Sequence, residues 1–365
     1  MLNILLLGVG QCGNRILDAV NHLSLGGGRF SKYYSQQQYA SNVHTIAINT
    51  ALNDLKEMKH TKAKDRVHIP YLHGVGANRN IGKQCFTENK DLLLRTIEER
   101  GNFDVAFVIT SASGGTGSSF APSLVNELKK RYSFPIYAII VLPFREEGTL
   151  YMQNAAFCLQ EIRETSVDGI ILVDNQFLKQ AGKDIKTAYD SINKMVAERF
   201  LFLMRALDSE MMMVTDLGDF NTLMASGARL ATFGFSKGDK DQSIKDVIKE
   251  SMSPRGLLFS MSPYKEAVRA MIIIQGDKKY LDINEITDEV ETLSSEVGHV
   301  FKGILIRNKE QPQVLTILSL SASEELDKFY RAAIDAINKE KEQKEKTANR
   351  KEKASDLLKG MEPEY

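Results

Sequence analysis

Two glycine-rich turns have the clearest capacity for chemistry in this sequence. Residues 8–13 (Gly-Val-Gly-Gln-Cys-Gly) follow an apolar run and lead into a helical pattern, and residues 113–119 (Ser-Gly-Gly-Thr-Gly-Ser-Ser) do the same. Backbone amides in such turns and the N-termini of the helices that follow them bind anions. Because the carboxyl ends of neighbouring parallel strands meet at one edge of a sheet, the two turns together predict a polyphosphate site.

The first turn also fits the G-x-G-x-x-G pattern of dinucleotide-binding folds, so a nucleotide-dependent oxidoreductase remains an alternative. That function needs an acidic residue about 20 residues further on. The second apolar run ends instead in Asn49 and Thr50, and this lack of an acidic residue counts against the oxidoreductase alternative. A third loop, residues 73–78 (His-Gly-Val-Gly-Ala-Asn), is either a cover for the terminal phosphate or a tight turn.

Asp216 and Asp219 form a pair of carboxylates three residues apart. Carboxylates at i and i+3 lie on one side of a helical turn, where they can position a water molecule and favour a divalent cation. The commoner role for Asp216 would be an N-cap of the helix that begins after it. The six histidines and three cysteines show no spacing typical of metal ligands, so no metal site is certain.

The elements that must position these residues follow from hydrophobic patterning. Short apolar runs alternate with helical patterns up to about residue 175, which predicts a doubly wound α/β fold with a parallel sheet. The expected strands are residues 2–7, 43–48, 67–69, 105–110, 136–142 and 169–173. A one-sided apolar stripe predicts a long helix at 185–207. Beyond it, helices at 220–225, 242–252 and 284–296 and strands at 268–275, 300–306 and 314–320 predict a smaller α+β domain.

These patterns divide the chain into four parts. We expect a nucleotide-binding domain at residues 1–183, a central helix at 184–209, a C-terminal domain carrying the acidic pair at 210–323, and a charged helical tail at 324–365. Residues 25–42 form a polar, glycine-led insertion that is either a surface loop or a contact element.

Composition excludes several classes of partner. The 47 basic and 47 acidic residues cancel, so no net field favours nucleic acid or an anionic membrane. No apolar run reaches the roughly 18 residues of a membrane helix, and the apolar start of the chain lacks the basic residues of a signal peptide. We expect a cytoplasmic protein that binds no nucleic acid and does not insert into a membrane directly.

The two glycine turns carry a family resemblance. Residues 10–14 (Gly-Gln-Cys-Gly-Asn) and 114–118 (Gly-Gly-Thr-Gly-Ser), placed between strands and helices, resemble the tubulin/FtsZ superfamily. The third loop and the modest chain length make the sequence most similar to the archaeal CetZ group. Further segments in the family's order are 174–178 (Asp-Asn-Gln-Phe-Leu), 189–193 (Tyr-Asp-Ser-Ile-Asn) and 215–219 (Thr-Asp-Leu-Gly-Asp).

The resemblance implies that the ligand is GTP or GDP with magnesium (Mg2+). Glu147 would contact the ribose, and Asn175 and Asn193 would read the guanine edge, since an amide offers both a donor and an acceptor. The full set of implied nucleotide contacts is Gly10, Gln11, Cys12, Asn14, Gly76, Ala77, Ser113, Gly114, Gly115, Thr116, Gly117, Ser118, Glu147, Asn175, Tyr189 and Asn193.

The resemblance also implies that Asp216 and Asp219 are the catalytic residues and that they act on the nucleotide of the next subunit. Hydrolysis would then depend on polymerisation into head-to-tail filaments, with a role in cell shape and the possibility of an adaptor. Ser113, Val214, Ala51 and Tyr151 depart from the residues usual at their positions, which argues against fast hydrolysis and a standard division FtsZ. A cell-division protein and a polymer that hardly hydrolyses GTP remain alternatives.

Overall fold

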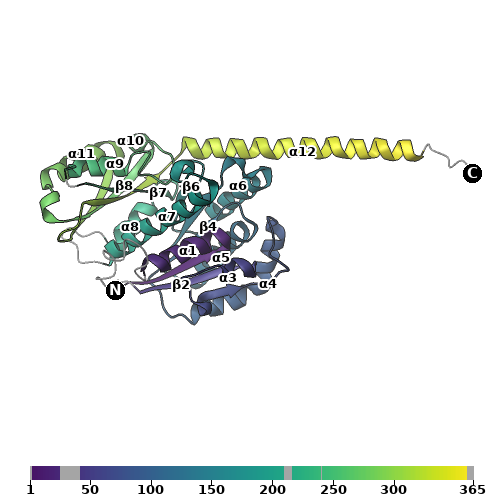
Figure 1. Ribbon diagram of the computed structural model, residues 1–365, viewed down its shortest axis with the longest axis horizontal. Helices are drawn as coiled ribbons and strands as arrows, with labels where there is room; N and C mark the ends of the chain where they lie inside the picture. The colour runs from purple at the N-terminus through teal and green to yellow at the C-terminus, as the bar shows by residue number, and fades with distance from the viewer. Residues whose placement is uncertain (1, 25–41, 209–215, 240, 360–365) are drawn as a thin grey trace, which may run out of the picture.

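The computed structural model describes residues 2–24, 42–208, 216–239 and 241–359. In these residues the strands form one sheet of ten strands in the order β3-β2-β1-β4-β5-β6-β7-β10-β8-β9 (Figure 1). The predicted insertion at 25–42 lies outside the described residues except for Asn42, the first residue of β2.

The N-terminal strands are parallel to one another, as the sequence predicted. They are β1 (Asn3–Val9), β2 (Asn42–Asn49), β3 (Arg66–His68), β4 (Val105–Ser111), β5 (Ile136–Leu142) and β6 (Gly169–Asp174). The central ones are buried on both faces, which explains why their residues are almost continuously apolar. The α/β class is confirmed.

Helices cover both faces of this part of the sheet. One face packs against α4 (Arg79–Glu98), α5 (Gly115–Arg131) and α6 (Thr149–Glu164). The other packs against α1 (Gly10–Ser24) and the long central helix α7 (Ile185–Leu207). Shorter elements here are α3 (Leu52–Lys56) and the 3-10 turns η1 (Ala63–Asp65), η2 (Arg145–Glu147) and η3 (Lys179–Ala181).

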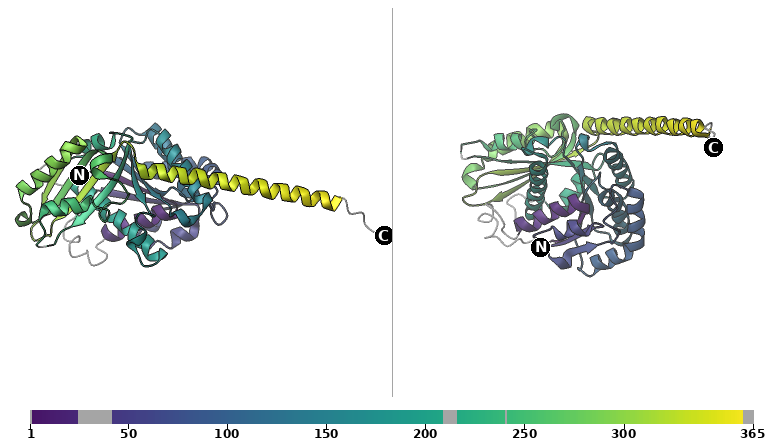
Figure 2. Two further views of the ribbon diagram at one scale, coloured as in Figure 1. Left: turned by 90° about the horizontal axis from the view of Figure 1, so that it is seen from above. Right: turned by 45° about the vertical axis from the view of Figure 1, so that its right-hand side comes forward.

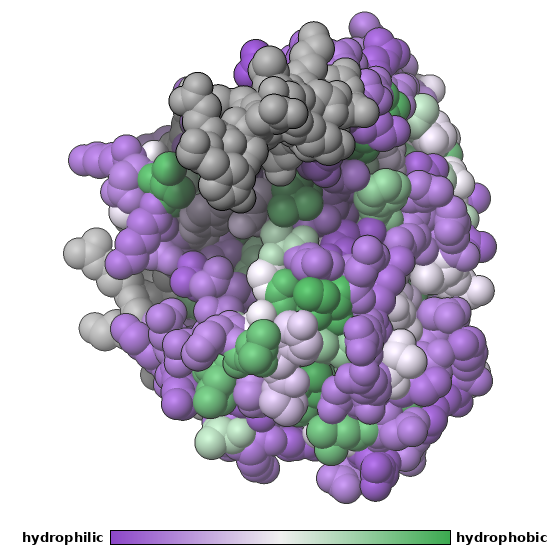
Figure 3. Space-filling view, turned by 90° about the vertical axis from the view of Figure 1, so that its right-hand side faces the viewer, coloured by the Kyte–Doolittle hydropathy of each residue, from purple (hydrophilic) through white to green (hydrophobic). Residues whose placement is uncertain are grey.

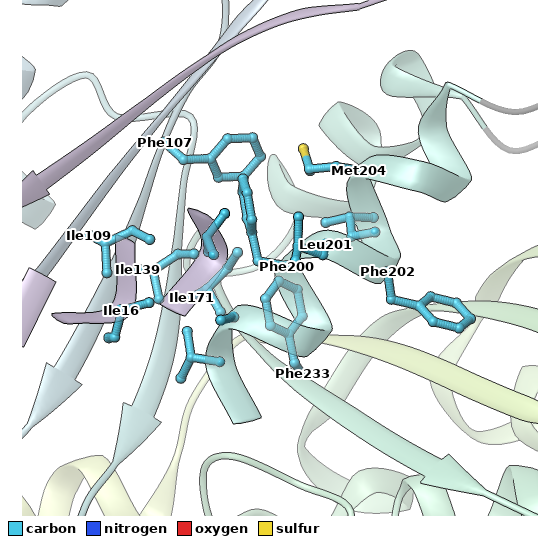
Figure 4. Close-up of a cluster of buried hydrophobic side chains, with 14 of the residues drawn as sticks. Ile16, Phe107, Ile109, Ile139, Ile171, Phe200, Leu201, Phe202, Met204 and Phe233 are labelled. Atoms are coloured by element: carbon cyan, nitrogen blue, oxygen red, sulfur yellow. The ribbon is translucent and has the colours of Figure 1, made fainter. Parts of the chain in front are cut away.

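Helix α7 joins the two halves of the molecule, and its bounds match the predicted stripe. Phe200 of α7 is fully buried and meets Phe107 of β4 edge-on, with ring centroids 5.2 Å apart. Phe233, from a strand of the second half, lies in the same cluster (Figure 4). The apolar stripe of α7 therefore packs against strands from both halves.

The second half continues the same sheet rather than starting a new one. β7 (Leu230–Lys237), which the sequence analysis missed, pairs in parallel with β6 and antiparallel with β10. Thr232 and Gly234 interrupt its apolar run, and a Cβ at Gly234 would lie only 2.1 Å from the carbonyl oxygen of Ser251. The remaining elements are α8 (Leu217–Met224), α9 (Ile244–Ser251), α10 (Pro263–Glu266), β8 (Ala267–Gly276), η4 (Lys278–Tyr280), α11 (Ile283–Val297), β9 (His299–Ile306) and β10 (Gln313–Leu320).

The last element is α12 (Glu324–Lys359). Leu326, Phe329 and Ala333 are buried in the core beside α6, and the helix then continues well beyond the body (Figures 1 and 2). Within the described residues, no helix combines the length and the apolar character needed to cross a bilayer.

Candidate functional site

A cavity of about 230 Å³ opens at the carboxyl ends of the parallel strands. Ten of the sixteen predicted nucleotide contacts line it: Gly10, Gln11, Cys12, Ser113, Gly114, Gly117, Glu147, Asn175, Tyr189 and Asn193. Val9, Arg15, Ser111 and Tyr151 also line it and were not predicted as contacts. The site therefore joins both glycine turns to the start of α7.

The two glycine turns touch each other at the cavity. Gly10 has a φ of +71°, which favours glycine, and a Cβ there would lie 3.0 Å from the backbone nitrogen of Gly117. Helix α1 begins at Gly10, and α5 begins directly after its N-cap residue Gly114. Two helix N-termini therefore face the same space, and their unpaired amides favour an anion there.

The third loop supports the second turn and does not line the cavity. A Cβ on Gly115 would lie 1.9 Å from the carbonyl oxygen of Gly76, so the two segments are in close contact. The buried Asn154 Nδ2 donates to the carbonyl oxygens of Ala77 (2.9 Å) and Ser113 (3.0 Å). Asn154 thus holds the third loop and the second glycine turn together. No pattern in the sequence predicted this role for Asn154.

Three other predicted contacts also face away from the cavity lining. Asn14 Nδ2 donates to the carbonyl oxygen of Ile48, and the Thr116 hydroxyl lies 2.7 Å from the Thr50 hydroxyl. Arg79 Nε donates to the hydroxyl of Ser118 at 3.1 Å. With Gly76, Ala77 and Gly115, these residues hold the turns in place and do not line the cavity, and their contacts with a nucleotide stay a prediction.

Glu147 organises the rim of the cavity beside α7. Its Oε1 accepts hydrogen bonds from the Tyr189 hydroxyl and from the Phe144 backbone nitrogen, both at 2.9 Å. Burial raises the pKa of Tyr189, and the nearby Glu147 raises it further. Burial and Glu147 also raise the pKa of the Cys12 thiol to about 12, so this thiol is protonated at neutral pH and is a poor nucleophile.

Asn175 and Asn193 place two amides at the far side of the cavity. Their residues are only 3% and 7% exposed. The side-chain oxygen of Asn175 is buried and has no hydrogen-bond partner among the described residues. A buried acceptor without a partner costs about 1–3 kcal/mol, so a ligand that donates a hydrogen bond here would recover that energy.

The acidic pair lies at the other end of the molecule. Asp216 is the N-cap of α8: its Oδ1 accepts from the Asp219 backbone nitrogen at 2.9 Å, which confirms the capping role considered for it. Asn193 of α7 lines the cavity, and the rest of the helix, residues 194–207 or about 21 Å, separates the cavity from the segment that leads to this turn (Figure 1). Thr215 and Val214 lie outside the described residues. In the described part of the chain no three His, Cys, Asp or Glu side chains form a metal site.

Comparisons with known proteins agree with this arrangement. Residues 3–183 match the family model "Tubulin/FtsZ family, GTPase domain". A tubulin-like protein CetZ of Methanothrix thermoacetophila is 56% identical over 100% of both chains. The chain belongs to the tubulin/FtsZ family. Within this family it falls in the CetZ group, and residues 3–183 are its GTPase domain.

Solved structures of CetZ proteins share this fold. A CetZ from Methanosaeta thermophila superimposes with a TM-score of 0.89 at 55% identity, covering 98% of each chain. The GTPγS-bound protofilament of CetZ2 from Haloferax volcanii gives 0.77 at 24% identity, covering 93% of this chain and 99% of that one. A GDP-bound CetZ1 monomer from the same organism also gives 0.77 at 24% identity, covering 92% of this chain and 99% of that one.

Proposed function

We propose that this protein binds GTP, assembles head to tail, and hydrolyses GTP at a site shared by adjacent subunits. The observation that carries the proposal is the distance between the two halves of the site. One chain holds the cavity at one end of α7 and the acidic pair at the other, so a complete site needs a second copy. The contact is heterologous and generates an open filament.

The cavity suits a guanine nucleotide with its phosphates at the helix N-termini. Backbone amides of α1 and α5 would hold the phosphates, Glu147 the ribose, and Asn175 and Asn193 the base. The related CetZ1 and CetZ2 structures contain GDP and GTPγS, which supports this ligand class.

Magnesium fits the same end of the site. Mg2+ in nucleotide sites is usually held by phosphates, waters and one or two carboxylates. Gln11, which lines the cavity, donates from Nε2 to Oδ1 of Asp54 at 3.1 Å, so a carboxylate lies beside the phosphate end. When bound, the ion would neutralise phosphate charge, and the chain would supply the orienting amides.

Asp216 and Asp219 would complete the site from the neighbouring subunit. Phosphoryl transfer depends mainly on positioning and electrostatic stabilisation, so carboxylates that orient the attacking water accelerate it only when they are in place. The exposed apolar side chains of Leu150, Tyr151 and Ile185 lie on or next to the cavity lining. Hydrophobic residues gather near the centre of the face seen from the projecting end of α12 (Figure 3), which suits a face covered by another subunit.

A complementation experiment tests the shared site. Asp219→Asn removes a catalytic group but keeps the cavity, whereas Gly114→Val fills the cavity but keeps the acidic turn. Each variant alone should be inactive, and an equimolar mixture should regain part of the wild-type GTPase rate. A mixture as inactive as its components, although both variants fold and copolymerise, would contradict the proposal.

We further propose a cytoskeletal role in cell shape, in the cytoplasm, with the protein itself as the main partner. The kinship with CetZ proteins supports this role over the main division ring. Depletion in the native host should change cell outline while division continues. Filamentous cells that fail to divide would favour the division alternative.

A further inference from the structure

The part of α12 that projects from the body is a helical arm (Figure 1). Ala333 is the last buried residue among those of α12 whose side chains are described, and residues 341–347 are all exposed. From residue 334 to 359 the helix is about 39 Å long. An arm of this length can reach across a neighbouring domain.

The arm leaves the body on the side that holds the cavity. β10 is antiparallel to the neighbouring β7, which is parallel to β6, so β10 ends at the edge opposite the cavity. From there α12 runs back: Arg145, which follows β5, lies 3.5 Å from Glu325 at the start of α12, and its guanidinium lies over the Phe329 ring at 5.0 Å. Figures 1 and 2 show the helix continuing past the body in this direction.

One stripe of the arm is basic. Lys339, Lys346 and Arg350 are spaced by seven and four residues, which places them on one side of the helix, where the only acidic residue between Lys339 and Arg350 is Glu342. All three are exposed, and none forms an ion pair among the described residues. Lys344, on the other side, instead pairs with Glu340 at 2.6 Å. Residues 339–353 as a whole contain seven Lys or Arg against four Glu.

The opposite end of the molecule carries a matching acidic surface on α11. Residues 281–298 contain no Lys or Arg. Asp288, Glu291 and Glu296 are exposed on this helix and form no ion pair among the described residues. Lys249 forms an ion pair with Glu289 of α11 at 3.7 Å, but Glu289 is buried, so this pair leaves the outer face of the helix negative.

We propose that, in the filament, the basic stripe of α12 binds the acidic outer face of α11 in the next copy of the chain. This inference rests on the proposed head-to-tail assembly. Figure 1 shows α11 near the end of the body away from the direction in which α12 projects. Stacking one copy in front of another along α7 therefore brings the arm alongside the neighbour's α9 to α11. Opposite charges on the two helices favour the contact, while the arm cannot reach its own α11.

Charge reversal of full-length protein tests the contact against a matched control. Lys346→Glu with Arg350→Glu reverses the basic stripe. Lys341→Glu with Lys344→Glu changes the net charge equally but lies on the other side of the helix. In GTP, the first pair should raise the critical concentration for sedimentation by about fivefold or more at low salt. The control pair should stay within about twofold of wild type, because it reverses charges outside the stripe.

A second pair of substitutions completes the test. Asp288→Lys with Glu291→Lys should weaken assembly in the same way, and combining it with Lys346→Glu and Arg350→Glu should restore assembly toward wild type. Unchanged assembly of the stripe variant, no recovery in the combined variant, or stripe-dependent flotation on anionic vesicles without any effect on assembly would overturn the inference. Wild-type protein that fails to assemble with GTP would contradict the proposed function itself.

Discussion

The two ends of α7 differ in how completely they are built. At its N-terminal end, Tyr189 is bonded to Glu147, Asn193 is nearly buried, and the glycine turns touch each other. Beyond its C-terminal end, Asp216 and Asp219 hydrogen-bond to each other at the surface. One end is preorganised for a ligand within a single chain, while the other offers the exposed Asp216 and the half-buried Asp219.

This contrast assigns different properties to the two ends. A preorganised cavity loses little entropy when its ligand binds, so binding should be a property of the monomer. Carboxylates outside any cavity of their own chain can act only where another surface brings a substrate to them. Variants at the cavity end should therefore change nucleotide affinity at every protein concentration. Variants at the acidic turn should change turnover only where subunits meet.

The largest effect is expected for Gly114→Val. Gly114 has an extended backbone (φ −72°, ψ 157°), and a Cβ there has no atom within 4 Å, so valine fits the protein but occupies the phosphate space. GTP affinity, measured with a fluorescent analogue, should fall by about 100-fold or more, with the melting temperature unchanged. Gly114→Ala should show an intermediate loss.

Gly115→Ala provides the contrast within the same turn. Its new Cβ would meet the carbonyl oxygen of Gly76 at 1.9 Å, so this variant should lose stability as well as affinity. If Gly114→Val bound GTP with wild-type affinity, the turn at residues 113–119 would not be part of the ligand site.

The next effect is expected at the acidic turn. Asp219→Asn should lower the maximal GTPase rate by about 100-fold or more, because electrostatic and positioning groups contribute on this scale. GTP affinity of the monomer should stay within about twofold. The matched variant Asp216→Ala also removes the N-cap of α8, so it should in addition cost about 1 kcal/mol of unfolding free energy. If Asp219→Asn lost as much GTP affinity as Gly114→Val, the contrast between the two ends would be contradicted.

Much of the fold was readable from the sequence because its signals are local. Strands buried on both faces are continuously apolar. The apolar stripe of α7 predicted both ends of that helix at the residues where the structure has them. β7 was missed because Thr232 and Gly234 break the apolar run, and only the neighbouring strands reveal its place in the sheet.

The candidate site was predictable only in part for the same reason. The glycine turns are recognisable from their composition. Arg15 could have been predicted as a cavity residue, because it lies four residues after Gln11 on α1 and therefore on the same side of the helix. Asn154 could not, because its role depends on two loops that meet only in the folded chain. The close contact of Gly115 with Gly76 is likewise tertiary, so the sequence pattern of either loop alone does not reveal it.

A smaller effect is expected for Asn175→Ala. The buried side-chain oxygen of Asn175 has no partner among the described residues, so removing it takes an unsatisfied acceptor out of the unliganded protein. The free energy of unfolding without nucleotide should therefore stay the same or rise, while GTP affinity falls by about tenfold. Scanning calorimetry without nucleotide measures the unfolding free energy, and titration calorimetry measures the affinity for GTP, with ATP as the comparison. A stability loss without a change in affinity would make Asn175 a structural residue.

The smallest effect is expected for Tyr189→Phe, which keeps the ring against Phe144 and removes only the hydroxyl that donates to Glu147. Glu147 Oε1 retains the Phe144 backbone nitrogen as a donor, so its carboxylate stays partly oriented. Losing one such hydrogen bond corresponds to about 1 kcal/mol, or about fivefold in GTP affinity. Because the change is confined to the cavity end, turnover per bound nucleotide in assembled protein should not change. A fall in that rate at full nucleotide occupancy would show that the rim beside α7 also shapes the contact with the next subunit, and the two ends would then be coupled.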